Sequence, residues 1–274
     1  TKYTELRDKA AQERERQAFL SDTGEIETST RDVLLLEEWQ KLKAAVDPHY
    51  HVVLELLLLG VIGSEMEALQ KRHLQGDTLL IRCAVMKVRP QKIAGENGHS
   101  ERHLKFKPKN WYRKRDIQLT ARLKLMLEEA AGRSVSTGNV TFDNDITVPA
   151  NQFILTMKDG SPFSYASFRK TVWDKAVKAA GIDLRVPYSL RHTLVQWALL
   201  IGMTKTRLVD LMGHCDKTMI DRVYGQYRKG LVKEKEQILV YLGEDFLALE
   251  ELKVTFPERY RAAMQSASAI LETT

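Results

Sequence analysis

A short C-terminal segment brings together three residue types that suit chemistry at a phosphate. Arg191, His214 and Tyr224 follow one another along it. An arginine offers two parallel N–H donors to a phosphate, a geometry that a lysine lacks. A histidine can donate to a phosphoryl oxygen or exchange a proton near neutral pH, and a phenol is a nucleophile once it lies in line with phosphorus. The trio predicts a site where a tyrosine attacks a phosphate ester held by a guanidinium and an imidazole.

The complete motif identifies a family. It runs Tyr188-Ser-Leu-Arg191-His192-Thr, then Met212-Gly-His214, with Tyr224 ten residues later. This order closely resembles the C-terminal signature of the tyrosine recombinases, also called phage integrases. The resemblance makes Tyr224 the nucleophile and places Arg191 and His214 on the phosphate oxygens. Tyr188 stands where the family most often has histidine, and its phenol can still donate a hydrogen bond, whereas His192 is expected to support helix packing.

A second phenol competes with Tyr224. Tyr227 follows three residues later, and side chains one helical turn apart cannot both point into a single site. The spacing from His214 favours Tyr224 as the nucleophile.

The first box of the family has a counterpart that departs from it at one position. Residues 58–65 resemble the family pattern of glycine, any residue, arginine, two residues, glutamate, with Gly60 and Glu65 in place. Ile62 stands where the family has its first phosphate-clamping arginine, and Glu65 matches a position that braces the site. Loss of one such donor typically lowers the rate about 10²–10³-fold. Ile62 therefore indicates an engineered substitution, a weakened enzyme, or rescue by another cation such as Arg72.

A basic segment supplies candidates for the general acid. In the family, a lysine of a β-hairpin protonates the departing 5′ oxygen, and a flexible ammonium group suits that task. Alternation along the strand does not choose between Lys105, Lys107 and Lys109, but the register to Ile117-Gln-Leu119 favours Lys109.

The same segment predicts contact with double-stranded DNA. Residues 101–115 hold seven cations against the single acid Glu101, with Phe106, Trp111 and Tyr112 between them. Basic side chains interleaved with aromatic ones are typical of a surface that follows phosphates. The predicted DNA-binding residues are Lys105, Lys107, Arg113, Lys114 and Arg115.

The sequence pattern around these residues predicts a mainly α fold with a small antiparallel β-sheet (α+β). We expect helices over 33–46, 50–59, 64–70, 121–131, 165–180, 189–201, 206–212 and 219–225. Strands are expected over 77–88, 102–119 and 153–156, with a polar loop over 132–149. Residues 1–30 are interpreted as a linker or the end of a preceding domain, 31–245 as the catalytic domain, and 246–274 as a tail that packs on a neighbouring protomer.

Length and composition limit the class of protein and the compartment in which it is expected. The chain has 274 residues, enough for one or two domains. Its 42 basic and 36 acidic residues give a net charge of +6, which by itself is weak evidence for a nucleic-acid partner. Cys83 and Cys215 lack metal-ligand spacing and fit a reducing cytoplasm. No apolar run is long enough for a membrane span.

The resemblance implies site-specific DNA recombination or integration. Attack by the tyrosine would form a 3′-phosphotyrosyl intermediate and release a 5′ hydroxyl, with neither ATP, a metal nor another cofactor, in a homo-oligomer assembled on DNA. One alternative is a weakened or inactive DNA-binding module of the same fold, because of Ile62. A type IB topoisomerase shares the chemistry, but the small size and the Asp-Gly-Ser-Pro and Met-Gly-His stretches argue against it.

Overall fold

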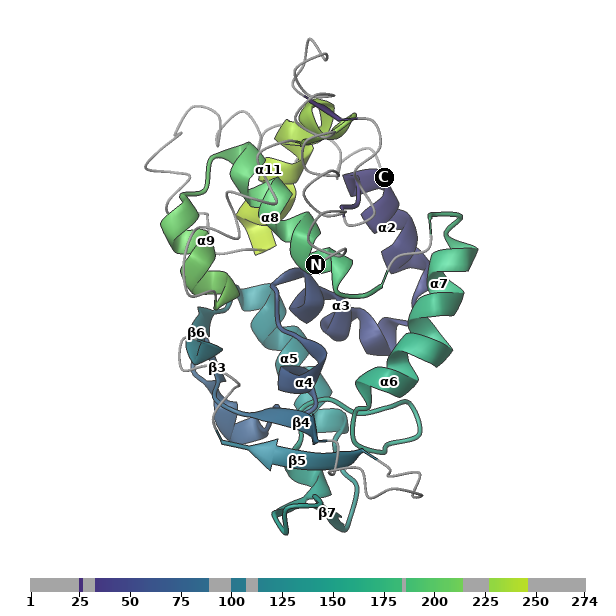
Figure 1. Cartoon of the computed structure of the whole chain (residues 1–274), viewed down its shortest axis with the longest axis vertical. Helices are drawn as coiled ribbons and strands as arrows, with labels where there is room; N and C mark the ends of the chain where they lie inside the picture. The colour runs from purple at the N-terminus through teal and green to yellow at the C-terminus, as the bar shows by residue number, and fades with distance from the viewer. Residues whose placement is uncertain are drawn as a thin grey trace, which may run out of the picture. The chain divides into compact units, whose positions relative to one another are not determined.

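The computed structural model describes residues 25–26, 33–88, 100–106, 113–183, 186–213 and 227–245 (Figure 1). They form two compact units, each of which is described by itself. The sheet-bearing unit comprises residues 46–176 and 210–213. The helical unit comprises the described parts of residues 1–45, 177–209 and 214–274. Residues from 31–245, predicted to form the catalytic domain, thus contribute to both units.

The sheet-bearing unit is built on a buried helix. After the 3₁₀ turn Pro48–Tyr50, whose N-cap Asp47 accepts a hydrogen bond from the His49 amide, α3 covers His51–Leu58. Every residue of α3 after His51 is buried, as expected for an almost wholly apolar helix. The longer helix α5, Ala121–Arg133, packs beside it (Figure 1). Thr120 caps α5 by accepting a hydrogen bond from the Leu123 amide.

The strands of this unit pair antiparallel, as predicted, but in three separate sheets. One sheet has the order β2-β3-β6, formed by Leu74–Gln75, Thr78–Ile81 and Arg115–Gln118. A second pairs β4, Ala84–Val88, with β5, Glu101–Lys105 (Figure 1). The chain leaves strand geometry between β3 and β4 and there changes its partner, so the segment 77–88 forms two strands.

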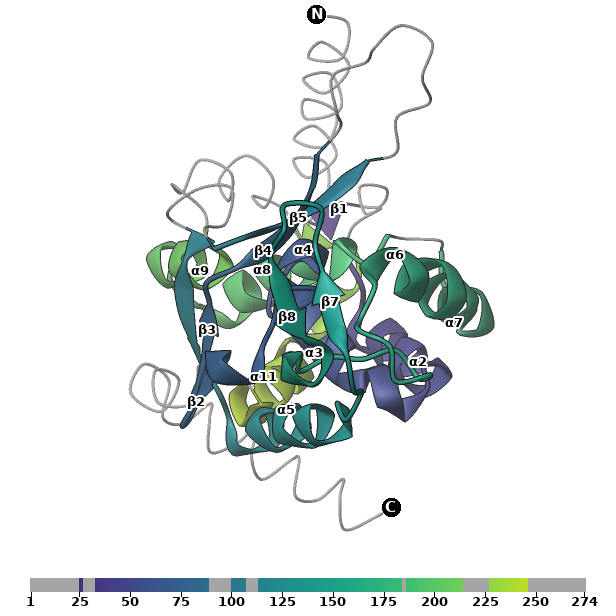
Figure 2. The same ribbon diagram turned by 90° about the horizontal axis from the view of Figure 1, so that it is seen from below.

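The third sheet corrects the loop predicted over 132–149. β7, Asn139–Thr141, pairs with β8, Thr147–Pro149, as a hairpin (Figure 2). The side-chain amide of Asn144 in its turn donates to the Leu104 carbonyl and accepts from the Leu104 amide. The polar composition suggested a loop, but hydrogen bonds to a strand 40 residues away and burial of Phe142 give this segment its order.

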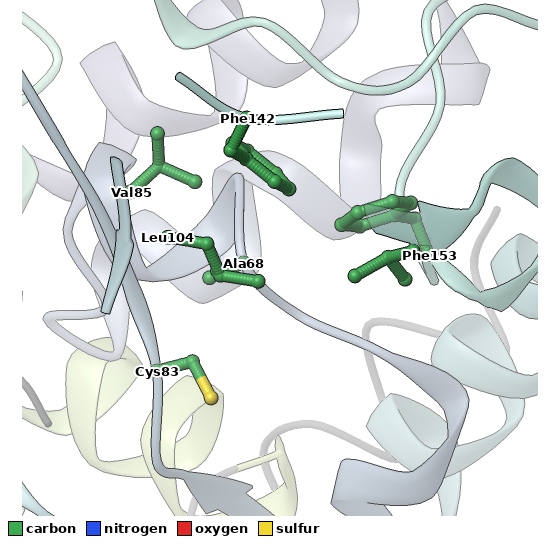
Figure 3. Packing of buried hydrophobic residues seen from close by; sticks show 7 residues of the cluster. Ala68, Cys83, Val85, Leu104, Phe142 and Phe153 are labelled. Carbon is green, nitrogen blue, oxygen red and sulfur yellow. The ribbon is translucent and has the colours of Figure 1, made fainter. Parts of the chain in front are cut away.

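A hydrophobic cluster joins the hairpin to β4 and β5. Val85 and Leu104 lie opposite one another in the β4–β5 register, and both side chains are buried. Figure 3 shows them beside Ala68 and the rings of Phe142 and Phe153. Phe153 is held by an isolated antiparallel bridge to Gln70, where the sequence suggested a strand over 153–156.

The helical unit is built around α8, Ser189–Ile201, which ends at Gly202 in the left-handed region, with φ 100°. α8 packs against α11, Lys235–Asp245 (Figure 1). The rings of Trp39 and Trp197 both meet Tyr241 edge-on, with centroids 6.4 Å and 6.1 Å away. Trp197 Nε1 also donates to the Leu34 carbonyl, which fixes the segment before α2 on α8.

The other described elements follow the predicted order with adjusted bounds, and the helix predicted over 219–225 lies outside the described residues. The helix expected over 165–180 contains a π-helical segment, and the helix expected over 64–70 is only one turn long. A short parallel pair, β1 with β9, lies in the helical unit. These elements are α2 Leu36–Ala45, α4 Gly63–Met66, the 3₁₀ turn Lys71–His73, the 3₁₀ turn Ala150–Gln152, α6 Tyr165–Phe168, the π-helix Arg169–Trp173, α7 Asp174–Ala179, α9 Lys205–Met212, β1 Glu25–Ile26, β9 Tyr227–Arg228 and the 3₁₀ turn Leu231–Glu234.

Candidate active site

The sheet-bearing unit places a buried carboxylate at the centre of the first-box segment. Glu65, on α4, is 1% exposed. Its Oε1 accepts from Arg115 Nη1 at 3.1 Å and its Oε2 from Arg115 Nη2 at 3.0 Å, a bidentate pair. Its Oε2 also accepts from the Ile62 amide at 3.2 Å. Glu65 therefore holds the backbone at Ile62.

Arg115, which the sequence predicted as a DNA contact, is buried in this site. It is 8% exposed, and besides Glu65 its guanidinium reaches two carbonyls. Nη2 donates to the Gly60 carbonyl at 3.2 Å and Nη1 to the Arg113 carbonyl at 3.1 Å. Because these acceptors use both terminal nitrogens of the guanidinium, Arg115 positions the first-box turn.

Arg113 lies beside the same carboxylate but is bound less tightly. Its Nη1 is 3.9 Å from Glu65 Oε1, and its side chain is 24% exposed. Its backbone is close-packed, because a Cβ added at Gly213 would lie 3.2 Å from the Arg113 Cα. Gly213 also has φ +60°, so glycine is required there on two counts. The contact brings Arg113 next to the residue that precedes His214 in sequence.

Ile62 is half-buried and begins α4 with an extended backbone, φ −88° and ψ 159°. The next residue, Gly63, faces the ring of Tyr165, and an added Cβ would come within 2.3 Å of that ring. Arg72, suggested as a replacement cation, is exposed on the 3₁₀ turn Lys71–His73, where its charge helps to lower the pKa of His73. The cations found beside Glu65 are Arg115 and, less tightly bound, Arg113.

The helical unit holds the second part of the predicted site. Arg191 lies in the first turn of α8 and is 3% exposed. Thr193, on the same turn, is fixed by two hydrogen bonds: its Oγ1 donates to the Ser189 carbonyl and accepts from the Leu34 amide. These bonds anchor the start of α8 and so fix the backbone that carries Arg191.

Tyr188 directly precedes α8 and is 42% exposed. Its ring meets that of His192 edge-on, with centroids 5.3 Å apart. The two rings therefore pack against each other at the start of α8.

Tyr227, the rival phenol, lies on β9 and is half-buried. Burial raises the pKa of Tyr227, and the positive charge of Lys205 only partly offsets this. The next residue, Arg228, forms an ion pair with Glu38, with Nη2 at 2.9 Å from Oε1, and its amide donates to Gln196 Oε1. The segment that follows Tyr224 is therefore anchored at Arg228.

Of the other predicted site residues, the structure describes Lys105 and Lys114 only. Lys105, at the end of β5, and Lys114, before β6, are both exposed. Lys107, Lys109, His214 and Tyr224 lie outside the described residues.

Sequence reasoning missed the different placement of neighbouring cations. Residues 115–118 alternate between buried and exposed, and extending that alternation backwards puts Arg113 on the face of Arg115 and Lys114 on the opposite face. The alternation was legible in the sequence and separates the inward arginines from the outward lysine. The Tyr165 ring over Gly63 had no such signal.

Within the described ranges, no cluster of three or more histidine, cysteine or acidic side chains could bind a metal ion. The buried His73 and Cys83 do meet, with Nε2 3.8 Å from Sγ. Burial lowers the pKa of His73 to about 4 and raises the pKa of the Cys83 thiol, so both are neutral packing groups near pH 7. None of the described helices is both long and apolar enough to span a membrane.

Comparisons with known proteins find similarity to integrases and recombinases. No protein-family model matches it. A stretch of 68 residues, 25% of this chain and 17% of the relative, is 38% identical to the putative defective protein IntQ of Escherichia coli (strain K12). A stretch of 66 residues, 24% of this chain and 16% of the relative, is 36% identical to the prophage integrase IntR of the same organism. The chain spans about a sixth of the length of these curated relatives.

Solved structures share the fold. The Tn1549 transposon integrase in complex with circular-intermediate DNA matches with a TM-score of 0.58 and 15% identity, over 78% of this chain and 69% of that chain. The XerA recombinase matches with a TM-score of 0.50 and 18% identity, over 75% of this chain and 64% of that chain. About a quarter of the chain is therefore similar in sequence to these two Escherichia coli proteins, and the chain carries the fold of a tyrosine recombinase catalytic domain.

Proposed function

We propose that the chain is the catalytic part of a site-specific recombinase that breaks and rejoins double-stranded DNA through Tyr224. The observation that carries the proposal is the order Arg191-His192, Met212-Gly-His214, Tyr224 on a chain with this fold. The anchoring of α8 beneath Arg191 supports it, because a phosphate clamp needs a preorganised donor.

The proposed reaction is a transesterification. The Tyr224 phenol attacks phosphorus and loses its proton to solvent, and the bond to the 5′ oxygen breaks as Lys109 transfers its proton to that oxygen. A 3′-phosphotyrosyl ester and a free 5′ hydroxyl result. A 5′ hydroxyl from a partner DNA then attacks the ester and releases the phenol, so the number of phosphodiester bonds is conserved and no energy source is needed.

Charge stabilisation accounts for the other proposed roles. Negative charge grows on the equatorial phosphate oxygens in the transition state, and preorganised donors there lower the barrier. Arg191 and His214 are proposed as these donors, with Tyr188 as a further one through its exposed phenol. Burial disfavours the phenolate of Tyr227, which supports Tyr224 as the nucleophile.

DNA affinity is assigned to exposed cations. Lys105 and Lys114 are exposed and lie close in sequence to Lys107 and Lys109, so we propose that they contact phosphates, whereas the buried Arg115 does not. Each phosphate contact should contribute to a salt-dependent affinity that is largely independent of sequence.

A covalent-adduct assay tests the proposal. The chain is incubated with a pool of nicked, end-labelled duplexes whose sequence is randomised around the nick, and products are separated under denaturing conditions. We expect a labelled protein band that is lost in Tyr224→Phe and retained in Tyr227→Phe. Absence of a Tyr224-dependent band from the unmodified chain would refute the proposed activity.

The second candidate is a DNA-binding module without activity, and Ile62 is the observation that favours it. The two functions differ in the same assay. Salt-sensitive DNA binding without an adduct from the unmodified chain, together with an adduct from Ile62→Arg, would identify Ile62 as the cause of inactivity.

A further inference from the structure

We infer that Arg113 supplies the phosphate-binding guanidinium that the first box lacks at Ile62. The inference rests on the proposed function and names a catalytic residue within it. It assigns Arg113 to the scissile phosphate, where the sequence alone suggested a general DNA contact.

Arg113 lies next to the first box. Its Nη1 is 3.9 Å from Oε1 of Glu65, and Oε2 of the same carboxylate accepts from the Ile62 amide at 3.2 Å. Two sequence-distant segments thus bring a cation to the turn where the family has its arginine. The close contact of Gly213 with the Arg113 Cα adds the segment that leads to His214.

The charges around Glu65 favour binding of an anion. Glu65, Arg113 and Arg115 form a cluster with one negative and two positive charges, all within salt-bridge distance of the same carboxylate. Arginines remain protonated at any relevant pH, so the cluster has an excess of one positive charge. Such an excess in a largely buried setting attracts an anion. Arg113 is the member that meets solvent, since its side chain is 24% exposed and that of Arg115 is 5% exposed.

The two arginines differ in the use of their terminal nitrogens. The four Nη–H donors of Arg115 bind the two oxygens of Glu65 and two backbone carbonyls, and its Nε is buried without a hydrogen-bond partner among the described residues. Arg113 is held near Glu65 by charge at 3.9 Å, which is beyond hydrogen-bond distance. Its Nε is buried and has no hydrogen-bond partner within the part of the chain that the structure describes. The Arg113 guanidinium therefore retains donors for a phosphate oxygen.

The backbone that carries Arg113 is held in place. The Arg113 carbonyl accepts from Arg115 Nη1 at 3.1 Å, and the Arg113 Cα packs against Gly213. A guanidinium on such a fixed backbone meets an anion without a large ordering cost, which a catalytic donor requires. Ile62 is half-buried at the same turn, and its amide donates to Glu65 Oε2.

The test measures the first-order rate of adduct formation at saturating DNA. The substrate is the duplex that the unmodified chain enriches from the randomised nicked pool. We expect Arg113→Ala to lower this rate about 10²–10³-fold, the typical cost of one lost oxyanion donor, and Arg113→Lys to recover part of it. Arg133→Ala is the matched control, because Arg133 is an exposed arginine of the same unit outside the proposed site. It should leave the rate unchanged.

Restoring an arginine at position 62 tests the inference more directly than the single variants do. If Arg113 replaces the missing first-box arginine, then Ile62→Arg should raise the rate of the Arg113→Ala variant far more than that of the unmodified chain. A general phosphate contact would instead raise the Kd for DNA and leave the saturated rate intact, which would overturn the inference. Circular dichroism and thermal unfolding of each variant separate loss of donor from loss of fold, and Arg113→Lys serves if Arg113→Ala unfolds.

The outcomes distinguish this inference from the function on which it rests. An adduct from the unmodified chain that persists at the same rate in Arg113→Ala and Arg113→Lys refutes the role of Arg113 alone. No adduct from the unmodified chain refutes both, because the site would then lack a working replacement for the first-box arginine.

Discussion

Removing Arg115 should destabilise the sheet-bearing unit more than any change at a surface ion pair. Arg115→Met keeps an apolar stem but deletes the bidentate pair with Glu65 and the bonds to the Gly60 and Arg113 carbonyls. The Glu65 carboxylate, 1% exposed, would keep the Ile62 amide and the Arg113 charge at 3.9 Å.

The magnitude follows from the cost of a buried charge. Breaking a buried pair by removing one partner costs about 3–5 kcal/mol. Because Arg113 remains near the carboxylate, we expect the lower end, about 3 kcal/mol. Glu65→Leu should also destabilise, since it leaves two guanidiniums without a counter-charge. The double variant should cost at least about 2 kcal/mol less than the sum of the two, because it removes both buried charges together.

Urea unfolding followed by circular dichroism measures the global effect. With a slope of about 2 kcal/mol per molar urea, the midpoint for Arg115→Met should fall by about 1.5 M. Hydrogen exchange of peptides covering α4 and β6 then locates the loss in the sheet-bearing unit. Lys124→Met, which removes an exposed pair with Asp77, is the control and should cost less than about 1 kcal/mol. Single variants that each cost under 1 kcal/mol, or effects that simply add, would refute the reasoning.

Three further predictions follow from particular contacts. Gly63→Ala forces its Cβ into the Tyr165 ring, 2.3 Å away, and should cost about 1–3 kcal/mol in urea unfolding, with Gly63→Ala/Tyr165→Leu partly restored. His73 has a pKa of about 4, below the unfolded value near 6.5. Its neutral form therefore contributes fully to the free energy of unfolding above pH 6.5, and this contribution is lost as pH falls toward 4. The loss from pH 7 to 5 should be up to about 2 kcal/mol and absent in His73→Gln; an unchanged pH slope would contradict this. Arg228→Ala, which breaks the part-buried pair with Glu38, should cost about 1–3 kcal/mol and slow Tyr224 adduct formation; an unaltered rate would show that this anchor does not position the segment.

Local pattern predicted the helices well and the short strands less well. The helix predicted over 189–201 has those bounds, because its apolar periodicity and Gly202 are local signals. The hairpin within 132–149 escaped prediction because contacts distant in the chain order it, such as those of Asn144 with Leu104. Separate sheets for β3 and β4 likewise depend on partners far along the chain.

The sequence by itself predicted the proposed chemistry and the resemblance to integrases. Residue type and spacing carry that information, since the order of Arg191, His214 and Tyr224 persists whatever the packing. It also predicted that Ile62 leaves the first box without its arginine. What it could not do was separate Arg113 from Arg115, because strand alternation puts both on one face and both have the same charge.

Only the tertiary structure separated the two arginines. Arg115 and Glu65 are 50 residues apart in sequence, and their pairing uses both terminal nitrogens of Arg115 inside the protein. Arg113 lies 3.9 Å from the same carboxylate, and its side chain is 24% exposed. The difference arises from distance and burial, because terminal guanidinium nitrogens that already bind a buried carboxylate and backbone carbonyls are not available to a phosphate.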